Sequence, residues 1–335
     1  MGSAWSASTM DIRYQGVLAV SRSALDSISV VIVTWNSSAD VRRCLTAVEG
    51  SRSDVSVPLD VIVIDNGSVD ETVPLVKEYF PDVLVITSHR NLGFGAAANI
   101  GIARTCGDVV LIINPDAYLE EGALVAMLQH LRSLPNLGCV APLHLTDNDR
   151  VESPARRFPT LMAAIADGTI IQRVLPQLPA LRSYYMSDDM NSDDPDWLVG
   201  ACLCFRRSAV AETGGFDVGY EMYSEETDLL RELRSNGWRC AVTPNARIQH
   251  RGGASADQDP IARERHFFKS RYRYVTKTWG WPVATALRVF VAISGLIRLL
   301  EQVIRMFRPA HRNDARREIR QIAALTVWQW FGWGR

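Results

Sequence analysis

Paired cysteines are absent from this chain of 335 residues. None of its six cysteines forms a CxxC pair, and most of them lie inside apolar runs. A zinc site or a disulfide framework would need closely or regularly spaced cysteines. The sequence therefore predicts buried, reduced thiols in a reducing compartment. The cysteines are Cys44, Cys106, Cys139, Cys202, Cys204 and Cys240.

An excess of charge of either sign is also missing. The formal net charge is -1, with 36 basic and 37 acidic residues. A general nucleic-acid binder is usually clearly basic, so we expect no nucleic-acid partner. With 47% apolar residues in 335, the composition is that of a globular protein with a large core.

The apolar pattern contains no recognisable secretory signal or long uncharged run. Residues 1–27 lack the charged start and apolar centre of a signal peptide, and we expect a poorly ordered leader there. Within residues 281–307 the longest uncharged run, Val289–Ile297, is far too short to cross a bilayer. The expected location is therefore the cytoplasm.

Apolar runs that alternate with helical patterns dominate the first part of the chain. The runs are rich in β-branched residues, which is typical of strands buried on both faces. Short links join them to the helices, and this order predicts a mostly parallel, three-layer α/β sheet. The expected strands cover residues 28–34, 59–64, 83–86 and 109–113.

The pattern is less regular beyond residue 116. Residues 147–196 lack periodicity, and we expect a long, partly mobile excursion of the kind that often covers a site. The expected helices cover residues 122–134 and 225–236, and the expected strands cover 139–142, 197–205 and 238–242.

The character of the chain changes again near Trp279. Residues 281–307 are largely apolar but carry four charged side chains, and residues 308–320 are rich in arginine. A basic, tryptophan-flanked pair of amphipathic helices is typical of a segment lying in the plane of a membrane surface. A helical hairpin packed on the domain, or on a second subunit of a homo-oligomer, is the open alternative.

Carboxylates follow two of the expected strands. Asp65 comes after the second strand and Asp116 after the fourth, within Asn114-Pro115-Asp116. Open parallel sheets bind ligands outside the carboxyl ends of their strands. There Asp116 can hold a divalent cation against a phosphate oxygen, and Asp65 can accept hydrogen bonds from a nucleobase or ribose. Both segments are also typical turn sequences, and a plain turn is the alternative.

Three further segments carry groups suited to a nucleotide or to proton transfer. The small-residue loop at 90–99 lets a helix N-terminus approach a diphosphate, although it lacks GxGxxG spacing. Glu225, Glu226 and Asp228 crowd one expected first turn, which suits either a general base or a solvated surface. His250 can contact a metal or phosphate, or it can be structural.

Together these segments resemble the inverting GT-A glycosyltransferases of family 2, and most of all bacterial rhamnosyltransferases that act on lipid-linked acceptors. The resemblance covers about residues 28–255. It implies a GT-A catalytic domain over 28–275, and we expect a membrane-associating or oligomerising amphipathic tail over 276–335. The matching pieces are VVIVTWN at 30–36, DNGS at 65–68, NLGFG at 91–95, NPD at 114–116, WLVGA at 197–201, GGFD at 214–217, EETDL at 225–229 and His250.

The resemblance also implies a role for each matched residue. Glu226 stands where the family has its general base, with Glu225 as the fallback. Asp116 matches the last Asp of the family's metal-binding DxD motif, with His250 as a further contact to Mg²⁺ or Mn²⁺. Asn114 replaces the first Asp of that motif, so fewer protein charges face the cation. The expected donor-binding residues are Thr34, Asn36, Asp65, Asn91, Gly93, Phe94, Gly95, Asn114, Trp197, Gly200 and Ala201.

The implied reaction is the transfer of L-rhamnose from dTDP-L-rhamnose to a hydroxyl of a polyprenyl-diphosphate-linked saccharide, for a cell-envelope polysaccharide. The enzyme would then lie on the inner face of the cell membrane. Another NDP-hexose donor stays open, as does a non-catalytic nucleotide-sugar binding protein. A sugar nucleotidyltransferase would carry a glycine-rich, basic loop after the first strand, where this chain has Thr34-Trp35-Asn36-Ser37.

Overall fold

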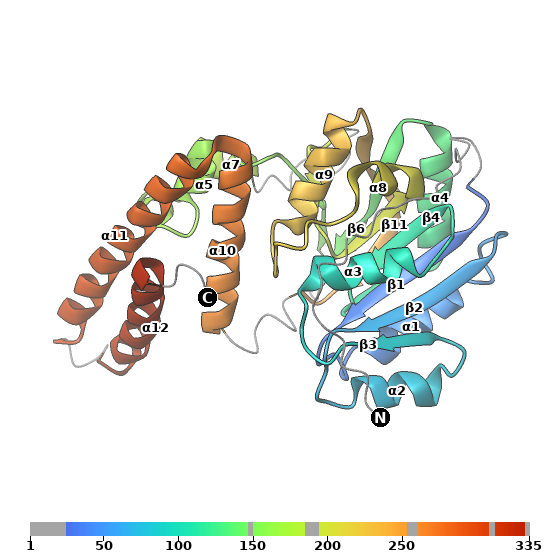
Figure 1. The fold of residues 1–335 in the computed structure, drawn as a ribbon, viewed down its shortest axis with the longest axis horizontal. Helices are drawn as coiled ribbons and strands as arrows, with labels where there is room; N and C mark the ends of the chain where they lie inside the picture. The colour runs from blue at the N-terminus through green and yellow to red at the C-terminus, as the bar shows by residue number, and fades with distance from the viewer. Residues whose placement is uncertain (1–24, 147–149, 185–193, 253–259, 308–311, 332–335) are drawn as a thin grey trace, which may run out of the picture.

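The chain folds, in a computed structural model, into a sheet-based unit and a smaller helical unit (Figure 1). The structure describes residues 25–146, 150–184, 194–252, 260–307 and 312–331. Most of the leader expected over residues 1–27 therefore lies outside the described residues.

The described part of the first unit contains a sheet of nine strands in the order β3-β2-β1-β4-β10-β6-β11-β5, with β7 paired to β6. Strands β1 to β4 run parallel, as do β6 and β11, whereas β10 runs antiparallel to both of its neighbours. This arrangement confirms the predicted, mostly parallel α/β sheet. The strands are β1 (Ile28–Thr34), β2 (Leu59–Asp65), β3 (Leu84–Thr87), β4 (Val109–Ile113), β5 (Ala117–Leu119), β6 (Leu137–Leu145), β7 (Val151–Glu152), β10 (Cys202–Arg206) and β11 (Arg239–His250).

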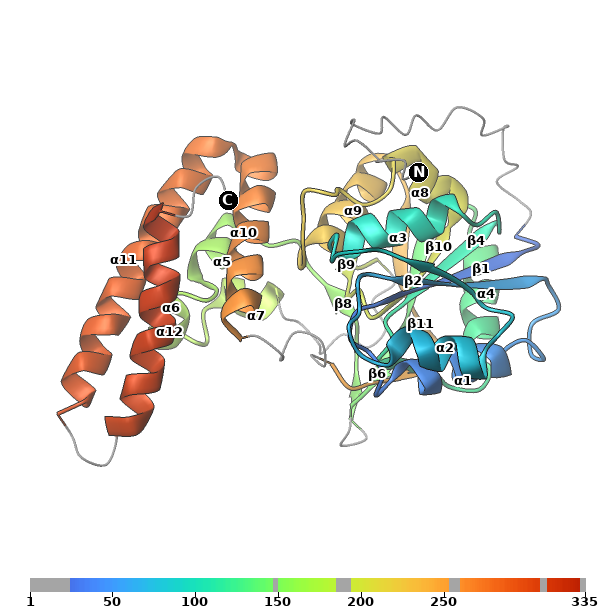
Figure 2. The ribbon, with the colours of Figure 1, turned by 60° about the horizontal axis from the view of Figure 1, so that its bottom comes forward.

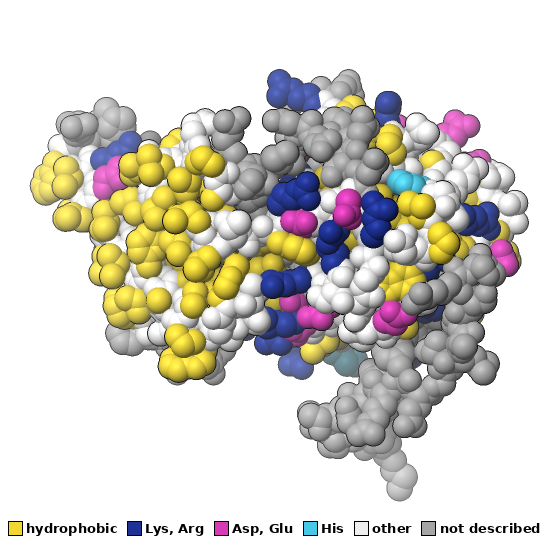
Figure 3. Space-filling view, turned by 90° about the horizontal axis from the view of Figure 1, so that it is seen from above, with side chains coloured by type: hydrophobic (Ala, Val, Ile, Leu, Met, Phe, Trp, Pro, Cys, Tyr) yellow, Lys and Arg dark blue, Asp and Glu magenta, His cyan; other side chains and the backbone are white. Residues whose placement is uncertain are grey.

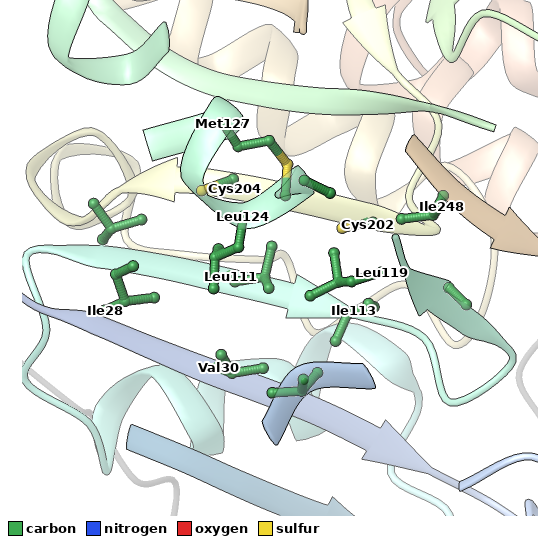
Figure 4. Packing of buried hydrophobic residues seen from close by; sticks show 14 of the residues in the cluster. Ile28, Val30, Leu111, Ile113, Leu119, Leu124, Met127, Cys202, Cys204 and Ile248 are labelled. Carbon is green, nitrogen blue, oxygen red and sulfur yellow. The ribbon is translucent and has the colours of Figure 1, made fainter. Parts of the chain in front are cut away.

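Helices cover both faces of this sheet. Because side chains alternate along a strand, Val30 and Ile32 of β1 join one core, whereas Val31 and Val33 join the other. Figure 4 shows the first core, where Leu111 lies beneath Leu124 of α4. Burial on both faces explains why the strands read as unbroken apolar runs. The helices of this unit are α1 (Val41–Gly50), α2 (Thr72–Tyr79), α3 (Phe94–Ala103), α4 (Ala123–Ser133), α8 (Arg207–Thr213) and α9 (Glu225–Ser235).

Several strands differ from the sequence-based expectation, since β5 was not expected and β6 is longer than the expected 139–142. The single strand expected at 197–205 is divided by a turn into β9 (Trp197–Leu198), which pairs with β8 (Ala155–Arg156), and β10 in the main sheet. Strand β11 is longer than expected, and its pairing with β6 is irregular between Thr243 and Arg247. Pro244 lies in that stretch and has no N–H for the ladder, which gives the irregularity a physical cause.

The helical unit combines two parts of the chain that are far apart in sequence (Figure 2). The excursion after residue 147 contains short helices that pack beside the C-terminal helices, and the lack of periodicity there did not indicate this partnership. A separate core joins Ala164 to Phe268, Val275, Leu287 and Val291. The helices of this unit are α5 (Leu161–Ala166), α6 (Ile170–Val174), α7 (Pro179–Tyr184), α10 (Pro260–Trp279), α11 (Trp281–Arg305) and α12 (Arg312–Phe331). The expected boundary at 275/276 falls inside α10.

A buried ion pair ties the two parts of the helical unit together. The guanidinium of Arg271 on α10 donates to the carboxylate and the backbone carbonyl of Asp167, which follows α5. Both side chains are buried, and Cζ of Arg271 lies 4.2 Å from the centroid of the Phe267 ring. At the surface, Arg173 of α6 forms an exposed bidentate pair with Glu301 of α11.

We expect Arg271→Met to lower the free energy of unfolding by about 3–5 kcal/mol, because it removes the buried guanidinium that pairs with the Asp167 carboxylate. Removing both charges with Arg271→Met and Asp167→Asn should recover much of this loss. Arg173→Met is the exposed control and should cost less than ~1 kcal/mol. Chemical denaturation measures all three. Equal losses for Arg271→Met and Arg173→Met would contradict the conclusion that the buried Arg271–Asp167 ion pair stabilises the helical unit.

Candidate active site

The carboxyl ends of β1, β2 and β4 bring the predicted site residues to one edge of the sheet. Thr34 pairs with Asp65 in the register of β1 and β2, and Ile32 pairs with Ile113 at the end of β4. The Asn114–Asp116 turn follows directly. Parallel strands that end in register place their last side chains together, as the sequence predicted.

Asp65 organises the corner between β1 and β2. Its buried carboxylate accepts hydrogen bonds from Thr34 Oγ1 at 3.0 Å, from the Ser68 amide at 3.0 Å and from Ser68 Oγ. Asn36 has a φ of 47°, and its amide donates to Ser68 Oγ at 2.8 Å. Thr34, Asn36 and Asp65 thus belong to one hydrogen-bonded corner. Their contact with a nucleotide stays a prediction.

The small-residue loop is fixed to this corner through two asparagines. Asn66 donates to Asn91 Oδ1 at 2.9 Å, and the Leu92 amide donates to Asn66 Oδ1 at 2.8 Å. Asn91 Oδ1 also accepts from the Gly93 amide at 2.9 Å. The loop therefore enters α3 in a defined conformation.

The same loop touches the segment that precedes the acidic cluster. Gly93 has a φ of 88°, and a Cβ atom there would lie 2.9 Å from the carbonyl oxygen of Glu221. The Phe94 amide donates to that carbonyl at 3.2 Å. A Cβ on Gly95 would lie 2.9 Å from Cβ of Phe216, so glycine permits close packing at both positions. The motif pattern did not reveal this contact.

Glu225 and Glu226 begin α9 after two residues in the left-handed region. Tyr223 has a φ of 71° and Ser224 a φ of 64°. The Oε2 atoms of both glutamates are buried and have no hydrogen-bond partner in the described residues. A Cβ atom on Gly200 would lie 3.4 Å from Cγ of Glu226, so the turn between β9 and β10 packs directly on this side chain.

Burial dominates the protonation of this pair. It raises the pKa of Glu226 to about 7, against the backbone N–H groups of Glu226 and Thr227, which lower it. Burial, with repulsion from Glu226, raises the pKa of Glu225 well above its usual value. Two adjacent buried carboxyls cannot both be ionised easily. One proton held on Glu225 leaves Glu226 as the carboxylate that can accept another.

Asp116 and His250 lie beside each other across the same edge. His250 pairs with Ala117 in the β11–β5 ladder, and its Nε2 lies 3.8 Å from Oδ1 of Asp116. Burial lowers the pKa of His250, although the Asp116 and Glu152 charges oppose this shift, so the imidazole is neutral at neutral pH. A carboxylate oxygen and a neutral imidazole nitrogen are suitable ligands for Mn²⁺ or Mg²⁺.

This donor set fits a cation that is shared with another ligand. No group of three or more His, Cys, Asp or Glu side chains suited to a metal occurs among the described residues. A cation here would therefore need further oxygen ligands, such as those of a diphosphate. The backbone of Asn114 is occupied on both sides, because its amide donates to the Ala201 carbonyl and its carbonyl accepts from the Cys44 thiol.

His144 was not predicted from the sequence. It lies on β6, and its ring meets that of His250 edge to face, with centroids 5.5 Å apart. Burial, followed by the charges of His250 and Arg156, lowers its pKa to about 3, so it packs as a neutral ring. A histidine between Leu143 and Leu145 near the carboxyl end of a buried strand was the available signal.

The Trp197–Ala201 segment has separate roles along its length. Gly200 packs against the Glu226 side chain. The carbonyl of Ala201 accepts a hydrogen bond from the backbone amide of Asn114. Trp197 is buried, and its indole N–H donates to the carbonyl of Arg157 in the excursion at 2.9 Å.

The model of the glycosyl transferase family 2 matches residues 29–210, which is more than half of the chain. The chain belongs to glycosyltransferase family 2. As in that family, it is an inverting glycosyltransferase. The match ends before Glu225, so the acidic pair and His250 lie outside it, and their roles stay predictions.

Two curated relatives extend the comparison. The chain is 28% identical over 313 residues to the N-acetylglucosaminyl-diphospho-decaprenol L-rhamnosyltransferase of Mycobacterium tuberculosis, covering 89% of this chain and 98% of that protein. It is 23% identical over 227 residues to the low-salt glycan biosynthesis hexosyltransferase Agl10 of Haloferax volcanii, covering 66% of each chain. The first match therefore extends into the helical unit.

Solved structures confirm the GT-A fold. The mannosyltransferase PcManGT from Pyrobaculum calidifontis, solved in complex with GDP-Man and Mn²⁺, superposes with a TM-score of 0.50 at 17% identity. The match covers 95% of this chain and 90% of that one. The predicted fold class, with helices at the C-terminal end, is thus correct.

The buried acidic pair should make stability depend on pH. A folded-state pKa that is raised above the unfolded value favours folding at low pH, and this contribution disappears as pH rises from about 4.5 to about 7. We therefore expect Glu226→Gln to raise the free energy of unfolding above that of wild type at pH 8. This gain should exceed the gain at pH 5 by on the order of 2 kcal/mol. Denaturation at both pH values, with exposed Glu232→Gln on α9 as the control, measures this. An unchanged pH dependence in Glu226→Gln would contradict the assignment.

Proposed function

We propose that the protein transfers L-rhamnose from dTDP-L-rhamnose to a hydroxyl of a polyprenyl-diphosphate-linked saccharide that contains N-acetylglucosamine. The observation that carries the proposal is the buried Glu226 beside Gly200, at the edge of the sheet where Asp116 and His250 also lie. The likeness to the mycobacterial rhamnosyltransferase over 98% of that protein supports the choice of sugar and acceptor.

The proposal gives distinct tasks to the two sides of the site. The Glu226 carboxylate takes the proton of the acceptor hydroxyl, whose oxygen then forms a bond to the anomeric carbon. The bond from that carbon to the donor diphosphate breaks from the opposite face, so a single displacement inverts the configuration. Glu225 stays protonated, which limits the negative charge beside the incoming hydroxyl.

Asp116 and His250 would hold a divalent cation together with the donor diphosphate. Bound Mg²⁺ or Mn²⁺ supplies positive charge that stabilises the leaving diphosphate. Because Asn114 stands where a second carboxylate usually does, the diphosphate itself has to contribute more of the cation's ligands. The corner formed by Thr34, Asn36 and Asp65 would receive the nucleoside.

A donor panel tests the proposal directly. With polyprenyl-diphosphate N-acetylglucosamine as acceptor and Mn²⁺ or Mg²⁺ present, we expect transfer from dTDP-L-rhamnose and little from UDP-GlcNAc or GDP-mannose. Glu226→Gln should abolish transfer and leave dTDP binding within about twofold, because the substitution removes the base and keeps the shape. Exposed Glu232→Gln is the matched control. Transfer from UDP-GlcNAc alone would overturn the donor, and wild-type turnover by Glu226→Gln would overturn the base.

We also propose that the helical unit lies on the inner face of the cell membrane. One described helix, Trp281–Met306, is long and apolar enough to cross a membrane by length and composition. An in-plane position is favoured because Leu287 and Val291 are buried in the protein while another side of α11 is exposed. Figure 3 shows apolar side chains gathered over this unit. The exposed apolar residues of α11 and its end are Trp281, Val289, Ile293, Leu296, Ile297, Leu300, Val303, Ile304 and Phe307.

Surface variants test this better than a truncation, because removing residues 281–335 would expose the core shared with α10. We expect Leu296→Glu combined with Leu300→Glu to weaken binding to vesicles of phosphatidylglycerol and phosphatidylcholine by more than ~10-fold. Val69→Glu, which changes an exposed residue of the catalytic unit, should leave binding unchanged. A wild-type dimer that the double variant dissociates, without vesicle binding, would instead assign this face to a second copy.

A further inference from the structure

Polar side chains make many of the contacts in the joint between the two units, beside an edge-to-face contact of the Tyr223 and Phe267 rings. In the described residues, the apolar side chains of α9, such as Leu229 and Leu233, belong to the core of the catalytic unit. Those of α10, such as Phe268 and Val275, belong to the core of the helical unit. Hydrogen bonds and ion pairs from one face of α10 cross between the units and reach the segment around α9 that carries Glu226.

The last turns of α10 bind two aspartates of that segment. Lys277 Nζ lies 2.5 Å from Oδ2 of Asp228 and 3.1 Å from Oδ2 of Asp217. Arg273 donates to both oxygens of Asp217 at 2.7 and 2.9 Å. Burial lowers the pKa of Lys277, but its hydrogen bonds to the two aspartates outweigh this effect and raise it. Lys277 therefore stays charged.

Neighbouring contacts extend the same joint along α9 and the loop before it. Arg231 of α9 donates to Thr278 Oγ1 at 2.6 Å and to the Tyr274 hydroxyl at 3.2 Å. Ser270 Oγ donates to the Met222 carbonyl at 2.7 Å. One face of α10 thus follows the chain from just before Glu225 to the second turn of α9.

The first turn of α9 needs such support. Tyr223 and Ser224 are non-glycine residues in the left-handed region, which persists only where surrounding contacts hold it. Farther along α9, Leu229 and Leu230 are anchored in the core, whereas the Oε2 atoms of Glu225 and Glu226 have no hydrogen-bond partner in the described residues. Asp228 is in that first turn, and its side chain is only 5% exposed against Lys277.

We propose that Lys277 is a positioning residue for catalysis: through Asp228 it holds the first turn of α9, and with it the Glu226 carboxylate, in the place where the acceptor hydroxyl is deprotonated. This inference rests on the proposed role of Glu226. It also makes α10 the connection between the membrane-facing helices and the base.

The test compares Lys277→Met with Lys277→Arg, which keeps the charge and can reach the same carboxylates. Lys77→Met makes the identical change at an exposed position of α2, away from α10 (Figure 1), and is the matched control. We expect Lys277→Met to lower kcat by about 10- to 100-fold while KM for the donor and dTDP affinity change by less than about twofold. Lys277→Arg should recover most of kcat, and Lys77→Met should leave it unchanged.

A double variant separates positioning from simple charge compensation. Lys277→Met leaves Asp228 unpaired, and adding Asp228→Asn removes that charge and should restore the melting temperature. We expect kcat to remain low, because the link to α10 is still missing. Recovery of wild-type kcat in the double variant would overturn the inference, as would wild-type kcat in Lys277→Met.

Amide exchange gives a readout that does not depend on the donor. Peptides covering residues 221–230 should exchange faster in Lys277→Met, and in the double variant, than in wild type or Lys77→Met. Unchanged exchange there would contradict the role of Lys277. A wild-type enzyme that is inactive with dTDP-L-rhamnose would instead overturn the proposed donor, and the exchange result would still decide the question of positioning.

Discussion

Strands buried on both faces leave polar side chains few places except the strand ends. In β1, β2 and β4, alternate residues enter two different cores, so a charged side chain in mid-strand would be buried without water. Because the three strands are parallel and in register, their carboxyl ends coincide. Thr34, Asp65 and Asp116 therefore meet at one edge, and this constraint determines where the remaining groups of the site must come from.

The other half of the site reaches the same edge by different routes. The turn at Gly200 arrives on β10, which runs antiparallel to β4 and so begins where β4 ends. His250 arrives at the end of β11, beside Ala117. Glu226 comes from a helix start that is buried by Gly200 and held by left-handed residues. In the proposed reaction, a carboxylate and imidazole on one side would bind the charged leaving group, and the buried acid pair on the other side would take the proton.

The parts of this arrangement that depend on local chemistry could be predicted from the sequence. Apolar runs predicted β1, β2 and β4, and the residues after them predicted the edge that carries Asp65 and Asp116. The contacts of Glu221 with Gly93 and of His144 with His250 could not be predicted, since they join residues whose separation in sequence carries no periodic signal. The break at Gly200 was missed because Val199 and Ala201 continue an apolar run. The partnership of α5 with α10 was missed because each helix shows an incomplete apolar face until the other is placed against it.

The helical unit is made from two stretches of chain that are separated by β10, α9 and β11. During synthesis, α5 to α7 leave the ribosome well before α10. Asp167 therefore emerges well before Arg271, with which it pairs. Strands β1 to β7 precede both stretches, and β10 and β11 lie between them, so the main sheet can pair first. The core of the helical unit needs α10 and α11. The contacts of α10 with α9 and the exposed apolar face of α11 can likewise form only when these helices have emerged. The order of translation therefore delays the contacts of α10 with α9, and the exposed apolar face of α11, until the sheet edge that carries Asp65 and Asp116 has been built.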